Sequence, residues 1–347
     1  MATQMIYDLV DPAELIDYVR AFDNEVLRPE GKIVLDELLP NRPIEDLEFR
    51  IRKGALLDVD VAEFRAWDTP ARMIGRQGTT RINGSLAPIS QQIPIGEEEM
   101  HRVRILQGGS NNPLINQIYD DAELMIRSVQ ARVELARGDL INDGKVTISE
   151  NGLTLEADFG RAAAMSVTAA TVWTNTAATI LSELMGWMED YVDQNGSEPG
   201  SLWMPRVRLG NFALNTEMRQ YAASNGTTPT RINSQTIDSI FAAEGLPPIR
   251  IYDGQFRVNG VRTRVLPVDK CFFMPAPGEA LGHTFYGPTA EAIKLAELGY
   301  IKASATPGVV AVVTSSDDPV QTFTKGAAVA LPAMPNPDLI MDMDVAS

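Results

Sequence analysis

The sequence predicts an α+β fold, and three observations lead to this prediction. Residues 112–141 carry one long helical pattern, residues 160–285 alternate helical and strand patterns, and residues 286–347 hold three strand-like runs. Strands that follow each other along the chain need a covering layer on their apolar face. We expect the long helix to cover the last three runs, so that the block between them is an insertion into one core.

Residues 1–46 are predicted to form an arm. Asp11 suits the cap and Pro12 the first position of a short helix over residues 11–22, and three further prolines interrupt the chain after it. Such a segment cannot build a core of its own, so we expect the arm to lie on something else. Residues 47–64 alternate in part, which predicts an extended strand with a break at Gly54.

Residues 69–96 form an acid-free flap in an acidic protein. The pair Asn83-Gly84 is typical of a hairpin turn, so we expect a long two-stranded flap, and a hairpin alone is marginal in water. The flap therefore needs a partner, and the acidic surface of another copy would supply one. The expected subunit-contact residues are Arg72, Ile74, Arg76, Arg81, Ile82, Ile89 and Ile93. The alternative is a loop packed on its own domain.

The helix over residues 112–141 is expected to be amphipathic, with Asn112 and Pro113 suited to its start. Its apolar side chains recur at steps of three or four: Ile118, Ala122, Met125, Val129, Val133, Ala136 and Leu140. Charged residues are expected on the remaining surface: Asp120, Asp121, Glu123, Arg127, Arg132, Glu134 and Arg137. The pair Asn151-Gly152 then predicts a hairpin whose packed side carries Val146, Ile148, Leu153 and Leu155.

Residues 160–285 are expected to form a mixed sheet flanked by helices. One helix carries a stripe of Ile180, Leu184, Met188 and Tyr191 and ends at Asn195-Gly196. A second carries Val207, Leu214, Met218 and Tyr221, and a third runs from Ser234 to Gly245. Short strands alternate with tight turns at Asp253-Gly254 and Asn259-Gly260.

Motifs for chemistry are weak. Asp139, Asp143, Gly144, Val146 and Glu150 match positions of a calcium-binding loop, but Ile141 stands where that loop needs an oxygen. Residues 58–61 and 342–345 pair carboxylates in strand-like runs, which are expected to face solvent, and His101 and His283 stand alone. We expect no catalytic, cofactor or metal site. An enzyme with an unrecognised carboxylate site within residues 160–285 is the alternative, and a calcium-regulated binding module is a further one.

Composition narrows the class of protein. The chain has 347 residues, 44% of them hydrophobic, and a net charge of −16, which argues against a sequence-reading nucleic-acid binder. No run approaches the roughly 18 apolar residues of a membrane helix, and the first residues do not resemble a signal peptide, so we expect a protein made and used in a cytoplasm. The single Cys271 excludes an internal disulfide, and its apolar neighbours predict a buried thiol.

The order of these parts resembles the tailed-phage major capsid proteins of the lambda-like E type, which have the HK97-like fold. The segments that carry the resemblance span nearly the whole chain: LPNRPIEDLEFRIRKG (39–54), RAWDTPARMIGRQG (65–78), IYDGQFRVNGVRTRVLP (251–267), LGHTFYGPTAEA (281–292) and ALPAMPNPDLIMDMDV (330–345). No single segment is as specific as a metal signature. Their order is what indicates the family.

The resemblance implies a division into an N-terminal arm (1–46), a strand (47–64), an extended loop (65–97), a peripheral domain (98–175) with the long helix as spine, an inserted axial α/β domain (176–280) and a return to the peripheral domain (281–347). It implies a structural protein without enzymatic activity that self-assembles into hexamers and pentamers of an icosahedral head around double-stranded DNA. Portal, scaffold and decoration proteins are implied partners. The implied location is the virion, after assembly in the host cytoplasm. The family's covalent crosslink is not expected, because the flap contains no lysine.

Overall fold

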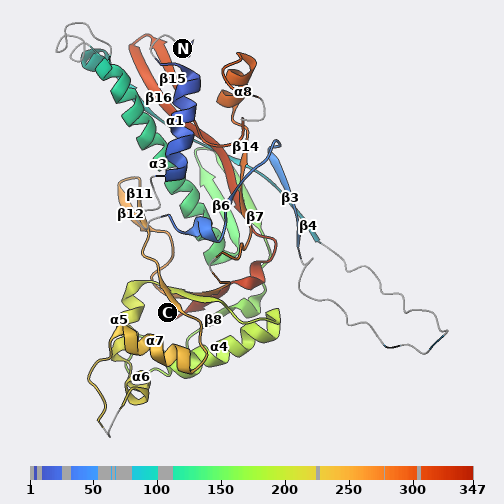
Figure 1. Cartoon of the computed structure of the whole chain (residues 1–347), viewed down its shortest axis with the longest axis vertical. Coiled ribbons are helices and arrows are strands. Elements are labelled where there is room, and N and C mark those ends of the chain that lie inside the picture. Colours follow the sequence, from blue (N-terminus) through green and yellow to red (C-terminus); the bar gives the residue numbers. More distant parts are fainter. Residues whose placement is uncertain are drawn as a thin grey trace.

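Two larger sheets dominate the fold: one lies along the long helix, and the other lies beyond the helix's C-terminal end. The computed structural model describes residues 4–5, 10–25, 33–53, 64, 67, 80–100, 112–223, 227–276, 278–302 and 306–346. Figure 1 shows the long helix α3 (Asn112–Asp143) beside the larger sheet, with a smaller α/β unit below it and a two-stranded ribbon standing off one side. The predicted α+β class is confirmed.

The larger sheet has six strands, and its centre is the long strand β16 (Val320–Ala333). One edge of β16 pairs first with β15 (Val310–Asp317) and then with β14 (His283–Gly287), and the other edge pairs with β5 (Ala87–Ile95). The short strands β1 (Gln4–Met5) and β2 (Asn41–Pro43) pair with β15 and β14 respectively. Residues from both ends of the chain therefore share one sheet.

Helix α3 covers this sheet, as predicted. Its predicted apolar stripe is buried apart from the partly buried Ala136, and the stripe packs against Ala311, Val313 and Ala328 of the strands. The approach is close at Gly326 of β16, where an added Cβ would lie 2.7 Å from the Cβ of Met125. Helix and sheet thus form two layers packed through apolar side chains.

Three charged residues that were expected on the surface of α3 are instead buried. Asp121 is 9% exposed, Glu134 0% and Arg137 3%. Glu134 and Arg137 form an ion pair of 2.9 Å, and Glu134 Oε1 also accepts from the amides of Val34 and Leu35. That part of the prediction was wrong because a short-range period does not reveal which segments return from far along the chain to cover a helix.

Arg137 extends this buried polar group to the larger sheet. Its Nε donates to Thr284 Oγ1 of β14 at 2.9 Å and its Nη2 to Asn41 Oδ1 of β2 at 2.6 Å. The hydroxyl of Tyr252 donates to Glu134 Oε1 at 3.1 Å, and burial followed by Glu134 raises the pKa of Tyr252 above its ordinary value. The arm, the sheet and the α/β unit therefore meet on one turn of the long helix.

The arm packs on the body of its own chain. Helix α1 (Pro12–Glu25) begins as predicted, with Asp11 Oδ1 accepting from the Ala13 amide at 2.9 Å. Leu15 and Val19 of α1 join the core under α3, while Ile16 joins a small cluster with α8 (Ala290–Glu297). The short 3-10 turn η1 (Leu35–Glu37) follows in the main core.

The α/β unit contains a mixed five-stranded sheet in the order β10-β9-β13-β17-β8. Its strands are β8 (Ser166–Thr168), β9 (Ser201–Met204), β10 (Ile249–Ile251), β13 (Lys270–Met274) and β17 (Met341–Asp344). The expectation that the last strand joins the sheet under α3 was wrong, because β17 lies between β13 and β8. The chain returns to this unit after crossing the larger sheet.

Four helices cover the outer face of this sheet: α4 (Ile180–Asn195), α5 (Arg206–Leu214), α6 (Thr216–Tyr221) and α7 (Ser234–Ala243). Helix α4 has its predicted stripe and ends at the left-handed Gly196. The predicted second helix is wrong, since Asn215 ends α5 and caps α6 by accepting from the Met218 amide at 3.1 Å. This break leaves Val207, Leu214 and Tyr221 about half exposed.

Two hairpins flank α3 near its C-terminal half. Strands β6 (Lys145–Glu150) and β7 (Leu153–Asp158) are joined at Asn151-Gly152, and β11 (Gln255–Val258) and β12 (Val261–Arg264) at Asn259-Gly260. Both Asn residues and both Gly residues have positive φ, as the predicted turns require. Val146 is buried, and Ile148, Leu153 and Leu155 pack partly buried against the main core, which confirms the predicted packed side.

Candidate subunit interface

The predicted flap has a different pairing from the one expected. Strand β4 (Thr80–Ser85) pairs with β3 (Glu48–Lys53) in an antiparallel, two-stranded ribbon, whereas residues 87–95 form β5 in the larger sheet. The expected turn at Asn83-Gly84 was wrong, because both residues lie inside β4. The ribbon instead joins residues on the two sides of positions 54–79, most of which lie outside the described residues.

Gly84 is needed in this ribbon for packing and not for a turn. It lies opposite Phe49, and a Cβ at position 84 would stand 2.4 Å from the Cζ of that ring. Phe49 is 2% exposed and stacks on Phe285 of β14, with ring centroids 5.6 Å apart and an angle of 4° between the rings. A second ring, Phe159, lies 6.3 Å from it. The root of the ribbon is therefore anchored by one aromatic side chain.

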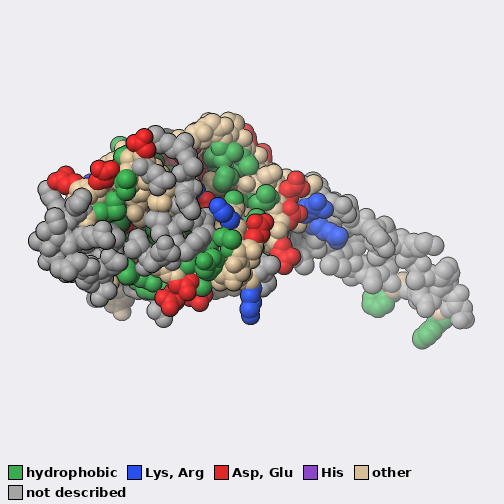
Figure 2. Space-filling view, turned by 90° about the horizontal axis from the view of Figure 1, so that it is seen from above, with side chains coloured by type: hydrophobic (Ala, Val, Ile, Leu, Met, Phe, Trp, Pro, Cys, Tyr) green, Lys and Arg blue, Asp and Glu red, His purple; other side chains and the backbone are tan. Residues whose placement is uncertain are grey.

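The two faces of the ribbon differ in character. Phe49 and Ile51 alternate with Arg50 and Arg52, and the exposed arginines lie on the face away from the core. An open crevice of about 710 Å³ lies at the root, and it is lined by both charged and aromatic side chains, including Arg42, His283 and Phe285. Burial followed by Arg42 lowers the pKa of His283. Figure 2 shows basic and acidic side chains together where the ribbon leaves the body.

The structure separates the residues predicted to contact a second subunit. Ile82 lies in β4 opposite Ile51 and packs partly buried against the main core. Arg81 lies in the same strand opposite Arg52, while Ile89 and Ile93 belong to β5, where Ile89 packs against the core under α3. Arg72, Ile74 and Arg76 lie outside the described residues. Ile89 and Ile93 thus lie in the body's own sheet, away from Ile82 and Arg81 in the ribbon.

Two aromatic residues beyond the ribbon were missed by the sequence reasoning. Phe64 is 107% exposed and Trp67 is 96% exposed. Large aromatic side chains are enriched among the residues that carry most of the binding free energy in protein interfaces. The signal was available in the segment EFRAWD, where two bulky aromatic residues stand three positions apart among charged ones. They are the strongest candidates for contact with another molecule among the described residues.

Other candidate chemistry is not supported by the geometry. The residues of the suspected calcium loop run from inside α3 through Gly144 into β6, so Asp139 and Asp143 are helical. Within the described residues, no group of three or more His, Cys, Asp or Glu side chains is placed to hold a metal ion. Cys271 is fully buried, and burial raises the pKa of its thiol to about 12. Asp342 was expected to face solvent, but it is 4% exposed.

No described helix is both long enough and apolar enough to cross a lipid bilayer. Helix α3, the longest described helix, has charged residues along its length; two of the ion pairs lie within the helix, and a third joins Arg132 to Glu150 of β6. Its length is used to span the larger sheet and to reach the α/β unit.

Comparison with solved structures shows the fold. The chain resembles a prophage protein of Escherichia coli CFT073 to which a capsid role has been ascribed, with a TM-score of 0.63 and 13% identity over 97% of this chain and 99% of that one. It also resembles a phage-related protein of Bordetella bronchiseptica RB50, with a TM-score of 0.56 and 13% identity over 100% and 98% of the two chains. The HK97-like capsid fold implied by the resemblance is confirmed.

Comparison with protein families shows the relationship by sequence. No curated protein is a significant match to the chain. The family described as phage major capsid protein E matches residues 34–345, which include the ribbon, the long helix, the smaller sheet and all of the larger sheet except β1. Because this match covers most of the 347 residues, the chain belongs to the phage major capsid protein E family.

Proposed function

We propose that copies of this chain form the pentamers and hexamers of an icosahedral phage head around double-stranded DNA, and that the β3–β4 ribbon and the loop beyond it bind a neighbouring copy. The observation that carries the proposed contact is the full exposure of Phe64 and Trp67 beyond a ribbon that stands off the body. Exposed aromatic side chains gain stabilising contacts when another surface covers them.

The family establishes the general role on which this proposal builds. The chain is a capsid-forming structural protein of the virion and not an enzyme, and its capsid role requires many copies in one shell. Nothing favours the carboxylate enzyme that was the alternative. The proposal adds which surface joins the copies and how the copies are arranged.

The charge distribution supports contact between copies of the same chain. Residues 69–96 carry three arginines and no acid, while the whole chain has a net charge of −16. A surface that is complementary to a different part of an identical molecule makes head-to-tail contacts, and these close into rings when the rotation allows. Each exposed ion pair contributes about 0–1 kcal/mol, so burial of apolar side chains and repetition of the contact must supply most of the stability.

We also propose the domain division and the partners that the resemblance implies. The proposed division has an arm at residues 1–46, a strand at 47–64, an extended loop at 65–97, a peripheral domain at 98–175 and 281–347, and an axial domain at 176–280. In a shell built this way, the ribbon would bind a neighbouring copy and the α/β unit would lie at the symmetry axes. In this division β8 and β17 add to the axial sheet. Portal, scaffold and decoration proteins would complete the head, which assembles in the host cytoplasm.

A charge-reversal experiment tests the contact. Changing Arg72, Arg76 and Arg81 to Glu should leave a folded, soluble subunit that forms no rings or shells in negative-stain micrographs. The matched control changes three exposed arginines away from the ribbon to Glu, which alters net charge equally and should preserve particles: Arg206 of α5, and Arg257 and Arg262 of the β11–β12 hairpin. Normal particles from the first variant would contradict the proposed contact, and loss of particles from both variants would assign the effect to net charge.

A further inference from the structure

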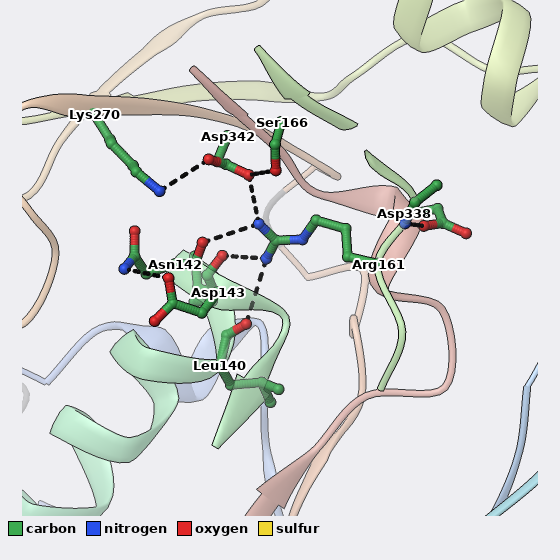
Figure 3. A network of polar contacts seen from close by, with 10 residues as sticks. Leu140, Asn142, Asp143, Arg161, Ser166, Lys270, Asp338 and Asp342 are labelled. Atoms are coloured by element: carbon green, nitrogen blue, oxygen red, sulfur yellow. Dashed lines mark hydrogen bonds and ion pairs between the residues drawn. The ribbon is translucent and has the colours of Figure 1, made fainter. Parts of the chain in front are cut away.

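Arg161 joins the end of the long helix to the sheet of the α/β unit. Its guanidinium donates to the carbonyl oxygens of Leu140, Ile141 and Asn142, with distances of 3.4 Å to Leu140 and 3.0 Å to Asn142. These carbonyls belong to the last turn of α3, where most carbonyl oxygens have no N–H donor within the helix and the helix end carries partial negative charge. Figure 3 shows Arg161 pointing between this turn and Asp342.

Asp342 is the other half of this joint. It accepts from Arg161 Nη1 at 2.8 Å and from Lys270 Nζ at 2.9 Å, and the Ser166 hydroxyl also donates to it. Lys270 comes from β13 and Ser166 from β8, the two strands that flank β17. Arg161 is 5% exposed and Asp342 6% exposed at their side chains. One carboxylate therefore links three strands of the sheet to the end of the helix.

Asp342 lies on the side of the sheet that faces α3. Its neighbours Met341 and Met343 belong to the core shared with the outer helices, and side chains alternate between the faces of a strand. On the inner face, Trp203, Phe272 and Met274 belong to the same core as Leu140 and Ile141 of α3. Among the described residues, the contact between the sheet and the last turn of the helix is thus mostly apolar around this charged joint, and the bond from Tyr252 to Glu134 lies further back along the helix.

We propose that the Arg161–Asp342 joint sets the angle at which the α/β unit stands on the long helix, and through it the curvature of the shell. Apolar contact is non-directional, so it favours close approach without selecting one orientation. The two Nη groups of Arg161 donate to three carbonyls and a carboxylate, and such hydrogen bonds are directional, so together they favour one orientation. The part of this inference that concerns curvature rests on the proposed assembly into shells, whereas the part that concerns the angle applies to the single subunit.

The joint also lies at the edge of the core, next to a cavity with polar walls. A small polar cavity of about 290 Å³ adjoins it, lined by Lys145, Asp158 and Lys270 among others. Lys270 is 23% exposed at its side chain. Replacing a buried ion pair with apolar side chains of similar size is often neutral for stability while the directional contact is lost. Stability and orientation can therefore be separated by mutation.

The test compares the double variant Arg161→Met, Asp342→Leu with a matched control. The control, Arg264→Met with Asp253→Leu, removes an ion pair of 2.6 Å whose side chains are 33% and 31% exposed and which lies at the β11–β12 hairpin. The joint variant should fold and form particles whose diameters, measured by electron microscopy, are at least twice as broadly distributed as those of the parent and the control. If particles of the joint variant have the same distribution of diameters as those of the parent, the proposed link between the joint and shell curvature is overturned. If the double variant does not fold, Arg161→Lys takes its place, because lysine keeps the positive charge but lacks the planar guanidinium that donates several directed hydrogen bonds.

A second measurement tests the angle without assembly. Spin labels on cysteines introduced at Leu124 of α3 and Asp190 of α4, both exposed, report the distance between the helix and the α/β unit. The joint variant should broaden this distance distribution relative to the parent and the control, whereas an unchanged distribution would overturn the proposal. Absence of shells from the parent itself would instead contradict the proposed function and leave this distance measurement decisive for the joint.

Discussion

At the scale of single residues, buried charge on the long helix decides how the arm is held. Glu134 is fully buried and receives hydrogen bonds from two backbone amides of the arm, from Tyr252 and from Arg137. A carboxylate with this many donors is stabilised in place, whereas removal of one partner leaves a buried charge uncompensated. The sequence pattern alone placed this residue on the surface.

Changing Glu134 to Ala should lower the free energy of unfolding by about 3–5 kcal/mol, because Arg137 would stay buried without its partner. Urea unfolding followed by circular dichroism measures the change. Glu150→Ala is the control, since it removes an exposed partner of Arg132 at 3.0 Å, and it should cost about 0–1 kcal/mol. Equal effects from the two variants would contradict the role assigned to the buried pair.

Asp121 gives a prediction about pH. Within the described residues its Oδ2 has no hydrogen-bond partner, and burial followed by Glu99 and Asp120 raises its pKa above the ordinary value. Folding therefore favours the protonated carboxyl. This contribution to stability is complete below the unfolded pKa of about 3.9 and is lost as the pH rises through the higher folded pKa.

Asp121→Asn should accordingly raise the free energy of unfolding at pH 7, because the neutral amide avoids the cost of the buried charge. It should also flatten the dependence of stability on pH above about pH 4. Denaturant unfolding at a series of pH values measures both effects. A variant that is no more stable than the parent at pH 7 would show that this carboxylate is well solvated.

At the scale of elements, the ribbon shows what a local pattern does and does not determine. Asn-Gly pairs at 151–152 and 259–260 form the predicted turns, because apolar and polar residues alternate on both sides of each pair. Another pair, Asn83-Gly84, has the same two residues but lies in a strand whose partner is about thirty residues earlier, at 48–53. A local motif does not show pairing over such a distance, and Gly84 is explained only by the Phe49 ring.

Gly84→Ala should destabilise the root of the ribbon by about 1–3 kcal/mol, because the new methyl group would overlap the Phe49 ring. Urea unfolding measures the loss. Gly96→Ala is the control, since an added Cβ at that position meets no atom within 4 Å. If the Gly84 variant were as stable as the control, the ring would have to move freely, and the stack on Phe285 would not anchor the ribbon.

The exposed pair on the loop supplies a second test at this scale. Replacing Phe64 and Trp67 with Ser should leave the melting temperature of the isolated subunit unchanged, because both side chains are already exposed, and should abolish or strongly weaken assembly. Light scattering measures assembly. Tyr221→Ser together with Val207→Ser, on half-exposed positions of the α/β unit, provides a comparison for general loss of surface apolar area. Unimpaired assembly of the loop variant would exclude both residues from the interface.

At the scale of the whole molecule, the layout was predictable while its connections were not. The long helix over the larger sheet and an inserted α/β unit follow from periodicity, since each element must bury its apolar face. The layout does not show that β17 lies between β13 and β8, or that β5 pairs with β16 and not within the flap. Both pairings depend on contacts between segments that are distant in the sequence. The residues that contact another copy were the hardest to predict, because a sequence pattern does not show which side chains the folded chain leaves exposed.

The same layout predicts which segments become protected from amide hydrogen exchange on assembly. Amide hydrogen exchange in the free subunit should be slowest in β16, which has partners on both edges under α3, and fast in the two-stranded ribbon. On assembly, protection should rise in residues 80–85 and change little in β16. Equal protection of the ribbon before and after assembly would mean that the neighbouring copy lies elsewhere.

The placement of Trp67 also makes the protein its own optical reporter. Of the four tryptophans, Trp173 and Trp203 are 1% exposed and Trp187 is partly buried, so Trp67 is the indole in full contact with water. Its emission maximum should lie at a longer wavelength than that of the buried indoles, and acrylamide should quench its fluorescence readily. Transfer of this side chain to a drier surrounding would shift the emission to the blue, which gives a label-free time course of capsid formation.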